Sequence, residues 1–178
     1  YRQWSALTRR LVIGLTHVLA ASRQDERRFR DLNWPDLQIS MLGNLKFDFD
    51  LSATLTDQER SKWNKELGIG ARPLVIGAST WPGEEDVLLD ALVRQKSETE
   101  RPAQLLIVPR HAERKPQIRR LLEQYAEEHG LTFHFRTDAK QAPGECDVYV
   151  ADTTGELRSL IQLADLAFIG KSMPPHTD

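Results

Sequence analysis

From residue 73 onward, short and almost wholly apolar segments alternate with amphipathic ones, and this alternation constrains the fold most. Leu105-Leu106-Ile107-Val108 is one apolar segment. In residues 116–128, which follow it, the apolar side chains are spaced 3, 1 and 3 apart, as on one face of a helix. An unbroken apolar run of four residues is typical of a strand buried on both sides. The alternation therefore predicts an α/β fold: a doubly wound parallel sheet with helices on both faces.

Capping residues and glycines divide the chain into predicted elements. Thr56 and Glu59 form a capping box before a helix that Gly68 ends. The predicted strands are 17–21, 38–42, 74–77, 105–108, 132–135, 148–151 and 166–169, and the predicted helices are the first residues of the chain, 23–32, 57–67, 82–94, 116–128 and 155–163. We interpret residues 1–50 as the end of a preceding domain with a connector, residues 51–178 as a nucleotide-binding-type domain, and the chain as a piece of a longer protein.

Composition excludes several classes of protein. The chain has 178 residues and a net charge of −2, so no overall basic field attracts nucleic acid. Its one cysteine excludes an internal disulfide and a Cys-rich metal site and favours a reducing compartment, and its five histidines lack metal-ligand spacing. No run approaches the ~20 apolar residues of a membrane span. Neither a Gly-x-x-x-x-Gly-Lys-Ser/Thr nor a Gly-x-Gly-x-x-Gly motif occurs, which argues against P-loop NTPases and dinucleotide oxidoreductases.

Three predicted strand-to-helix turns carry polar or cationic residues: 77–80, 109–111 and 152–157. Ligands of open α/β sheets bind at the carboxyl ends of the strands, so we expect one site there for an anionic ligand. Arg110 directly follows a buried strand, and its planar guanidinium suits phosphate. Thr153 and Glu156 have the spacing of a capping box, which leaves the role of this turn open between capping and ligand binding by the amides around Gly155. Ser79-Thr80 is equally typical of a helix cap.

Five segments, in order along the chain, resemble the transferases of 3-deoxy-D-manno-octulosonic acid (Kdo) in lipopolysaccharide assembly. They are Gly43-Asn44-Leu45-Lys46-Phe47-Asp48; Gly77-Ala78-Ser79-Thr80 with Gly83-Glu84-Glu85; Val108-Pro109-Arg110-His111 with Glu113-Arg114; Asp152-Thr153 with Gly155-Glu156-Leu157; and Ala164-Asp165-Leu166-Ala167-Phe168-Ile169-Gly170.

The resemblance implies a glycosyltransferase of the two-domain GT-B type that moves Kdo from CMP-Kdo to a lipid A precursor with inversion. It implies that residues 1–50 end the acceptor domain and that 51–178 form the donor-binding domain, incomplete at its end. The residues implied to contact the CMP-sugar are Pro109, Arg110, Thr154, Gly155, Glu156 and Leu157. Lys46 matches a lysine that stabilises the transition state, although a lysine in that setting is also typical of a plain surface residue. The resemblance implies no metal and no cofactor beyond the donor substrate.

The same resemblance implies a membrane surface as partner, reached through an N-terminal half outside this sequence, at the cytoplasmic face of the inner membrane of a Gram-negative-type cell. The family's glutamate base belongs to that half, and its last CMP-contacting motif would follow Asp178. We therefore expect the 178-residue chain alone to be inactive. Trp81 stands where many members have His. Two alternatives stay open: another GT-B glycosyltransferase with a different nucleotide-sugar donor, and a non-catalytic nucleotide-binding domain.

Overall fold

The computed structural model describes residues 14–32, 37–44 and 54–173. The chain divides into two compact units, residues 1–53 and 54–178. The interpretation of the first part as the end of an acceptor domain is not tested by this division and stays a prediction. The helix expected over the first residues of the chain falls mostly outside the described residues. No helix among the described ranges is both long enough and apolar enough to cross a membrane.

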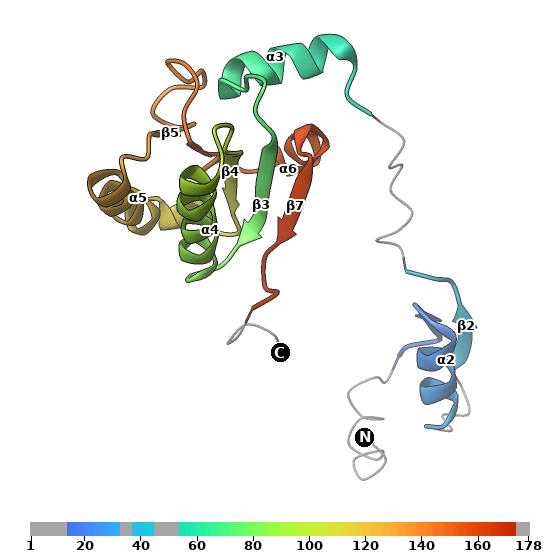
Figure 1. Cartoon of the computed structure of the whole chain (residues 1–178). Coiled ribbons are helices and arrows are strands. Elements are labelled where there is room, and N and C mark those ends of the chain that lie inside the picture. The colour runs from blue at the N-terminus through green and yellow to red at the C-terminus, as the bar shows by residue number, and fades with distance from the viewer. Residues whose placement is uncertain (1–13, 33–36, 45–53, 174–178) are drawn as a thin grey trace. The chain divides into compact units, whose positions relative to one another are not determined.

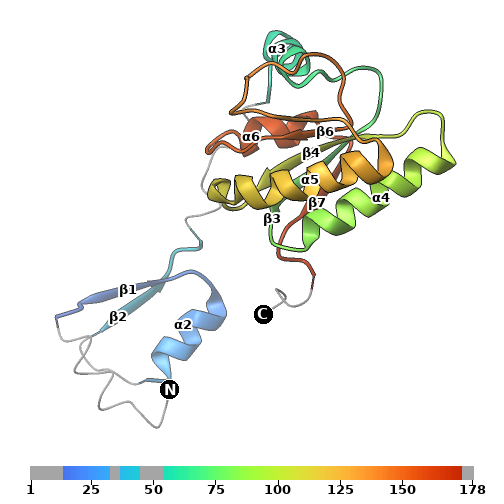
Figure 2. The same ribbon diagram turned by 90° about the vertical axis from the view of Figure 1, so that its left-hand side faces the viewer.

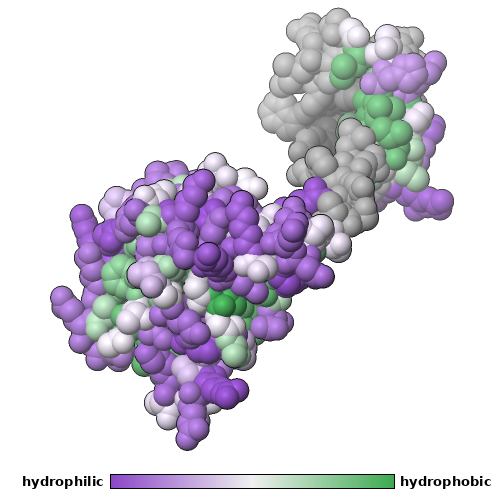
Figure 3. Space-filling view, turned by 90° about the horizontal axis from the view of Figure 1, so that it is seen from above, coloured by the Kyte–Doolittle hydropathy of each residue, from purple (hydrophilic) through white to green (hydrophobic). Residues whose placement is uncertain are grey.

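The first unit contains a small parallel sheet and one helix. Strand β1 (His17–Ala20) pairs in parallel with β2 (Gln38–Met41), and α2 (Arg23–Arg30) lies between them in sequence, as predicted. The side chain of Ser22 accepts a hydrogen bond from the backbone N–H of Asp25 and so caps the start of α2. A hydrophobic patch is visible on this unit in Figure 3, and the exposed large apolar residues among its described positions are Leu15, Leu19, Met41 and Leu42.

The second unit is built on a five-stranded, all-parallel sheet (Figure 1), which confirms the predicted fold class. The strand order is β5-β6-β4-β3-β7. In chain order the strands are β3 (Leu74–Thr80), β4 (Gln104–Pro109), β5 (Phe133–Phe135), β6 (Val148–Val150) and β7 (Leu166–Ile169).

Helices cover both faces of this sheet. Helices α4 (Glu84–Glu98) and α5 (Lys115–His129) lie side by side on one face (Figure 2), where residues such as Ile107 and Val150 are fully buried. On the other face are α3 (Asp57–Leu67), α6 (Leu157–Leu160) and the short 3₁₀ helix η4 (Ile161–Leu163), packed on residues such as Leu106. Successive strand residues thus alternate between two cores. Complete burial of one such side chain contributes about 1.5–3 kcal/mol.

The predicted capping of α3 is confirmed. The Thr56 side chain accepts from the Glu59 backbone N–H, the Glu59 carboxylate accepts from the Thr56 backbone N–H, and Gly68 ends the helix in the left-handed conformation with φ 61°. These contacts are local in sequence, so the pattern alone was sufficient to predict them.

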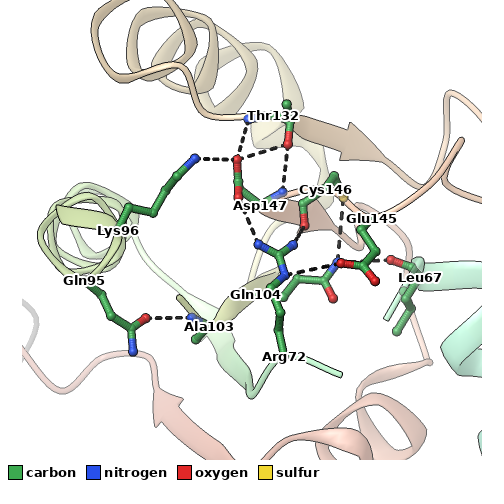
Figure 4. Close-up of polar contacts among 10 residues, drawn as sticks. All are labelled: Leu67, Arg72, Gln95, Lys96, Ala103, Gln104, Thr132, Glu145, Cys146 and Asp147. Atoms are coloured by element: carbon green, nitrogen blue, oxygen red, sulfur yellow. Dashed lines mark hydrogen bonds and ion pairs between the residues drawn. The ribbon is translucent and has the colours of Figure 1, made fainter. Parts of the chain in front are cut away.

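At the amino end of the sheet, a buried carboxylate ties four elements together (Figure 4). Asp147, just before β6, accepts from both the N–H and the hydroxyl of Thr132 and from the ammonium of Lys96 on α4 at 3.0 Å. The Arg72 guanidinium, just before β3, donates to the same carboxylate at 3.1 Å. Burial by itself raises the pKa of Asp147, but the Thr132 N–H, Lys96 and Arg72 outweigh burial and lower it. The Asp147 carboxylate thus has a structural role at this end of the sheet.

Candidate functional site

The point where the helical connections change face lies between two neighbouring strands, β4 and β6. The chain leaves β4 toward α5 on one face and leaves β6 toward α6 on the other. The strands pair in parallel with Ile107 opposite Val150, and the Ala151 N–H donates to the Ile107 carbonyl at 2.8 Å. This register brings the turn after β4 beside the turn after β6. Ligands of open α/β sheets bind at such a switch point.

Arg110 offers a cation at this point. Its backbone N–H donates to the Thr80 carbonyl at 3.0 Å, which fixes the turn after β4 against β3. The side chain is exposed, and within the described part of the chain its guanidinium makes no hydrogen bond or ion pair. Pro109, the last residue of β4, is buried. The guanidinium of Arg110 is therefore available to an anion, and the neighbouring Pro109 is rigid and apolar.

The turn after β6 differs from its sequence prediction. Helix α6 begins at Leu157 rather than at residue 155, and Glu156 occupies the N-cap position, so the Thr153–Glu156 capping box, one of the two alternatives left open for this turn, is not formed. The Thr153 hydroxyl instead donates directly to the Glu156 carboxylate. Gly155 has φ 88°, a value that favours glycine. The backbone N–H groups of Gly155, Glu156 and Leu157 donate no hydrogen bond to any residue that the structure describes.

The carboxylate of Glu156 is occupied by Arg136, which sequence reasoning missed. Both Nε and Nη2 of Arg136 contact the two carboxylate oxygens, at 2.7 and 2.8 Å. Burial alone would lower the pKa of Arg136, but its hydrogen bonds to Glu156, Tyr149 and Glu66 outweigh burial and raise it. The Glu156 carboxylate is thus engaged within the protein by Arg136 and by the Thr153 hydroxyl.

A second polar network lies between the end of β6 and the start of α5. Asp152 is buried, accepts from the backbone N–H and the hydroxyl of Thr137, and lies 3.3 Å from the Lys115 ammonium. Lys115 also contacts Asp138 at 2.7 Å. The hydrogen bond with Asp138 is the main cause that raises the pKa of Lys115, and the same bond lowers the pKa of Asp138. These charges satisfy one another and hold the turn after β5 beside that after β6.

The turn after β3 is built by two buried glutamates rather than by a Ser or Thr cap. The Thr80 hydroxyl donates to the Glu85 carboxylate at 2.6 Å, and Arg114 grips the same carboxylate in two-point fashion at 2.8 and 2.9 Å. The Glu84 carboxylate accepts from the Trp81 N–H at 2.8 Å. Gly83, with φ 89°, occupies the N-cap position of α4. The guanidinium of Arg114, unlike that of Arg110, is thus engaged in an ion pair that stabilises the fold.

The predicted site residues group as follows. Six lie in or directly next to two neighbouring turns at the carboxyl end of the sheet: Pro109, Arg110, Thr154, Gly155, Glu156 and Leu157. Lys46 lies outside the described residues, so its role stays a prediction. Among the described ranges, no group of three or more His, Cys, Asp or Glu side chains could hold a metal ion. For both Asp152 and Arg136 the sequence held a signal, a charged residue directly after a predicted strand.

Comparisons with known proteins identify relatives of the chain. Residues 1–49 match the family model described as 3-deoxy-D-manno-octulosonic-acid transferase (kdotransferase). The 3-deoxy-D-manno-octulosonic acid transferase of Haemophilus influenzae is 31% identical over 167 residues, which are 89% of this chain and 36% of that protein. A bifunctional glycosyltransferase/methyltransferase of Fusobacterium nucleatum is 29% identical over 97% of this chain and 26% of its own length. The chain therefore spans between a quarter and two fifths of these relatives.

A solved structure matches as well. The crystal structure of the C-terminal CMP-Kdo binding domain of WaaA from Acinetobacter baumannii is 28% identical, with a TM-score of 0.53, over 65% of this chain and 57% of that chain. These matches confirm the resemblance to the transferases of 3-deoxy-D-manno-octulosonic acid: residues 1–49 match the model of that family, and the chain as a whole is similar to its members.

Proposed function

We propose that this chain supplies the donor-binding part of a glycosyltransferase that transfers Kdo from CMP-Kdo to a lipid A precursor. The observation that carries the proposal is the switch point between β4 and β6, where Arg110 and the turn after β6 follow neighbouring strands and where neither the Arg110 guanidinium nor the backbone N–H groups of residues 155–157 have a partner in the described part of the chain. Both features suit a phosphate. The domain of the Acinetobacter relative that this chain resembles is described as binding CMP-Kdo.

In this proposal each site residue has one task. Arg110 pairs with the nucleotide phosphate, Pro109 provides an apolar surface beside it, and the amides of residues 154–157 donate to the ligand. Lys46 offsets negative charge as the nucleotide phosphate leaves, which is a form of electrostatic stabilisation that needs no metal ion. The donor is CMP-Kdo and no further cofactor takes part.

The remaining partners follow from the same proposal. The acceptor is a lipid A precursor, and the complete protein works at a membrane surface on the cytoplasmic face of the inner membrane. The first unit exposes apolar side chains, Leu19 and Leu42 among them, and exposed apolar patches are typical of surfaces that contact a protein or a membrane.

Calorimetric titration of the 178-residue chain with CMP and with UMP tests the proposal. We expect CMP to bind more tightly than UMP. Arg110→Ala should weaken CMP binding about 10- to 100-fold, because a hydrogen bond between charged groups contributes about 1.5–3 kcal/mol. Arg101→Ala is the matched control: Arg101 is also an exposed arginine but lies just before β4, at the opposite end of the sheet, and its loss should leave the affinity unchanged.

Three outcomes would contradict the proposal. Equal binding of CMP and UMP would favour a glycosyltransferase with a different nucleotide-sugar donor. Equal losses in the two arginine variants would show that general charge, and not the switch point, attracts the nucleotide. The absence of binding by the unmodified chain at millimolar CMP would mean that residues 1–178 do not form a donor site by themselves.

A further inference from the structure

Arg136 is a buried cation at the carboxyl end of the sheet for which the proposed chemistry has no use. It directly follows β5, and its side chain is only 5% exposed. A buried arginine is retained only where its donors are satisfied, because an unpaired buried charge is costly. Its partners therefore show what the side chain holds in place.

The strongest contact of Arg136 is with the turn after β6. The two-point contact with Glu156, at 2.7 and 2.8 Å, fixes the direction of the guanidinium plane as well as its position. The Glu156 carboxylate also accepts a hydrogen bond from the Thr153 hydroxyl, so the first and the last residue of the turn are linked through this one carboxylate. The Glu156 carbonyl accepts from the N–H groups of Ser159 and Leu160, at 3.0 and 3.1 Å. Through Glu156, Arg136 thus sets the turn and the first residues of α6.

The other contacts of Arg136 anchor it to the body of the second unit. Nη2 donates to the Glu66 carboxylate of α3 at 3.0 Å, and Nη1 donates to the Tyr149 hydroxyl of β6 at 3.3 Å. The guanidinium lies over the ring of Trp63, 4.8 Å from its centroid. One cation therefore joins a loop turn to a helix and a central strand, and the turn gains the rigidity of both.

Rigidity matters at this turn because the turn has few other constraints. Thr154 and Gly155 are exposed, Gly155 takes a conformation open chiefly to glycine, and the amides of residues 155–157 have no partner among the described residues. A flexible turn would have to be ordered by each ligand that binds, and that ordering would weaken the affinity. A turn that is already ordered before the ligand arrives binds it without this loss of affinity.

We propose that Arg136 is a positioning residue for donor binding: its two-point contact with Glu156 holds the turn of residues 153–156 in the conformation that receives the nucleotide. The inference rests on the proposed function, because it presumes that this turn contacts the CMP-sugar. Arg136 itself does not touch the ligand.

Three variants of the 178-residue chain test the proposal. Arg136→Lys keeps the positive charge but removes the two-point geometry, and Thr153→Val removes only the hydroxyl that contacts Glu156. Glu66→Gln is the matched control, since it weakens the arm of Arg136 that reaches α3 and leaves the arm to Glu156. CMP affinity is measured by calorimetry, the order parameters of the backbone N–H groups of residues 154–156 by ¹⁵N relaxation without nucleotide, and the unfolding temperature by calorimetry.

We expect Arg136→Lys to weaken CMP binding about tenfold and to lower the order parameters at residues 154–156 from about 0.85 toward 0.6. Thr153→Val should produce smaller changes in the same direction, and it supplies the answer if Arg136→Lys does not fold. Glu66→Gln should lower the unfolding temperature, whereas its effects on the CMP affinity and on the order parameters should be clearly smaller than those of Arg136→Lys, because the contacts of Arg136 with Glu156 and Tyr149 remain.

A merely structural role predicts a different pattern. If Arg136→Lys and Thr153→Val fold with unchanged order parameters and unchanged CMP affinity, or if Glu66→Gln weakens binding as strongly as Arg136→Lys, the proposal is wrong. If the unmodified chain binds no CMP, the proposed function fails. The order parameters measured without nucleotide then still decide whether Arg136 holds the turn.

Discussion

Replacing Asp147 by Asn removes a negative charge from between two cations at the amino end of the sheet. The Asp147 side chain is 10% exposed, and its partners Arg72 and Lys96 are 19% and 30% exposed. Loss of one partner from a buried ion pair costs about 3–5 kcal/mol. Partial exposure of the two cations screens this cost, and Asn keeps an oxygen that can accept from Thr132. We therefore expect a loss of about 2–3 kcal/mol in the free energy of unfolding.

The pH dependence of this loss gives a sharper test than its size. The pKa of Asp147 is lower in the folded chain than in the unfolded one, where it is about 3.9. The ionised carboxylate thus stabilises the fold fully above this unfolded value, and the stabilisation disappears as the pH falls through the folded pKa. Asn does not titrate. The difference between the two chains should be constant from about pH 7 to about pH 5 and should shrink below about pH 4.

Urea unfolding followed by circular dichroism at several pH values measures the difference, with Asp138→Asn as the matched control. Asp138 also pairs with two cations, Lys115 and Arg119, but its side chain is 44% exposed. Exposed pairs contribute about 0–1 kcal/mol, so the control should be nearly neutral. Similar losses in both variants, or a loss for Asp147→Asn that is as large at pH 3 as at pH 7, would refute the reasoning.

Two further predictions concern packing. A Cβ at Gly170 would lie 2.0 Å from the Ser79 carbonyl oxygen, so Gly170→Ala should lower the free energy of unfolding by about 2 kcal/mol or more in a urea titration. The control is Gly144→Ala, whose Cβ would meet nothing within 4 Å and which should change this free energy by less than about 0.5 kcal/mol. Equal effects of the two substitutions would show that the turns at Ser79 and Gly170 separate freely. Burial raises the pKa of the Cys146 thiol, so the folded chain should react with a disulfide reagent at pH 8 far more slowly than the chain in 8 M urea, and equal rates would mean that this core opens readily.

The elements that the sequence predicted well are those fixed by neighbouring residues. The capping box of Thr56 and Glu59, the left-handed end at Gly68 and the apolar run 105–108 all depend on contacts or periodicities within a few positions. The sequence predicted in the same way that Arg110 would follow a central strand at the ligand-binding end of the sheet. Its exposure and its lack of partners among the described residues agree with that placement.

Contacts between distant positions decided the rest. The spacing of Thr153 and Glu156 left a helix cap open as one role of their turn, but Arg136, twenty positions before Glu156, contacts the Glu156 carboxylate, and the helix starts at Leu157. Likewise Arg114 resembled Arg110 in sequence, but a buried Glu85 on α4 engages it. Which ion pair a charged side chain forms depends on the distances and the burial in the folded sheet, and the local spacing of residues determines neither of these. The sequence by itself therefore determined the strand and helix order and the end of the sheet that holds the candidate site, whereas only the tertiary structure decided which of the charges there remain available to a ligand.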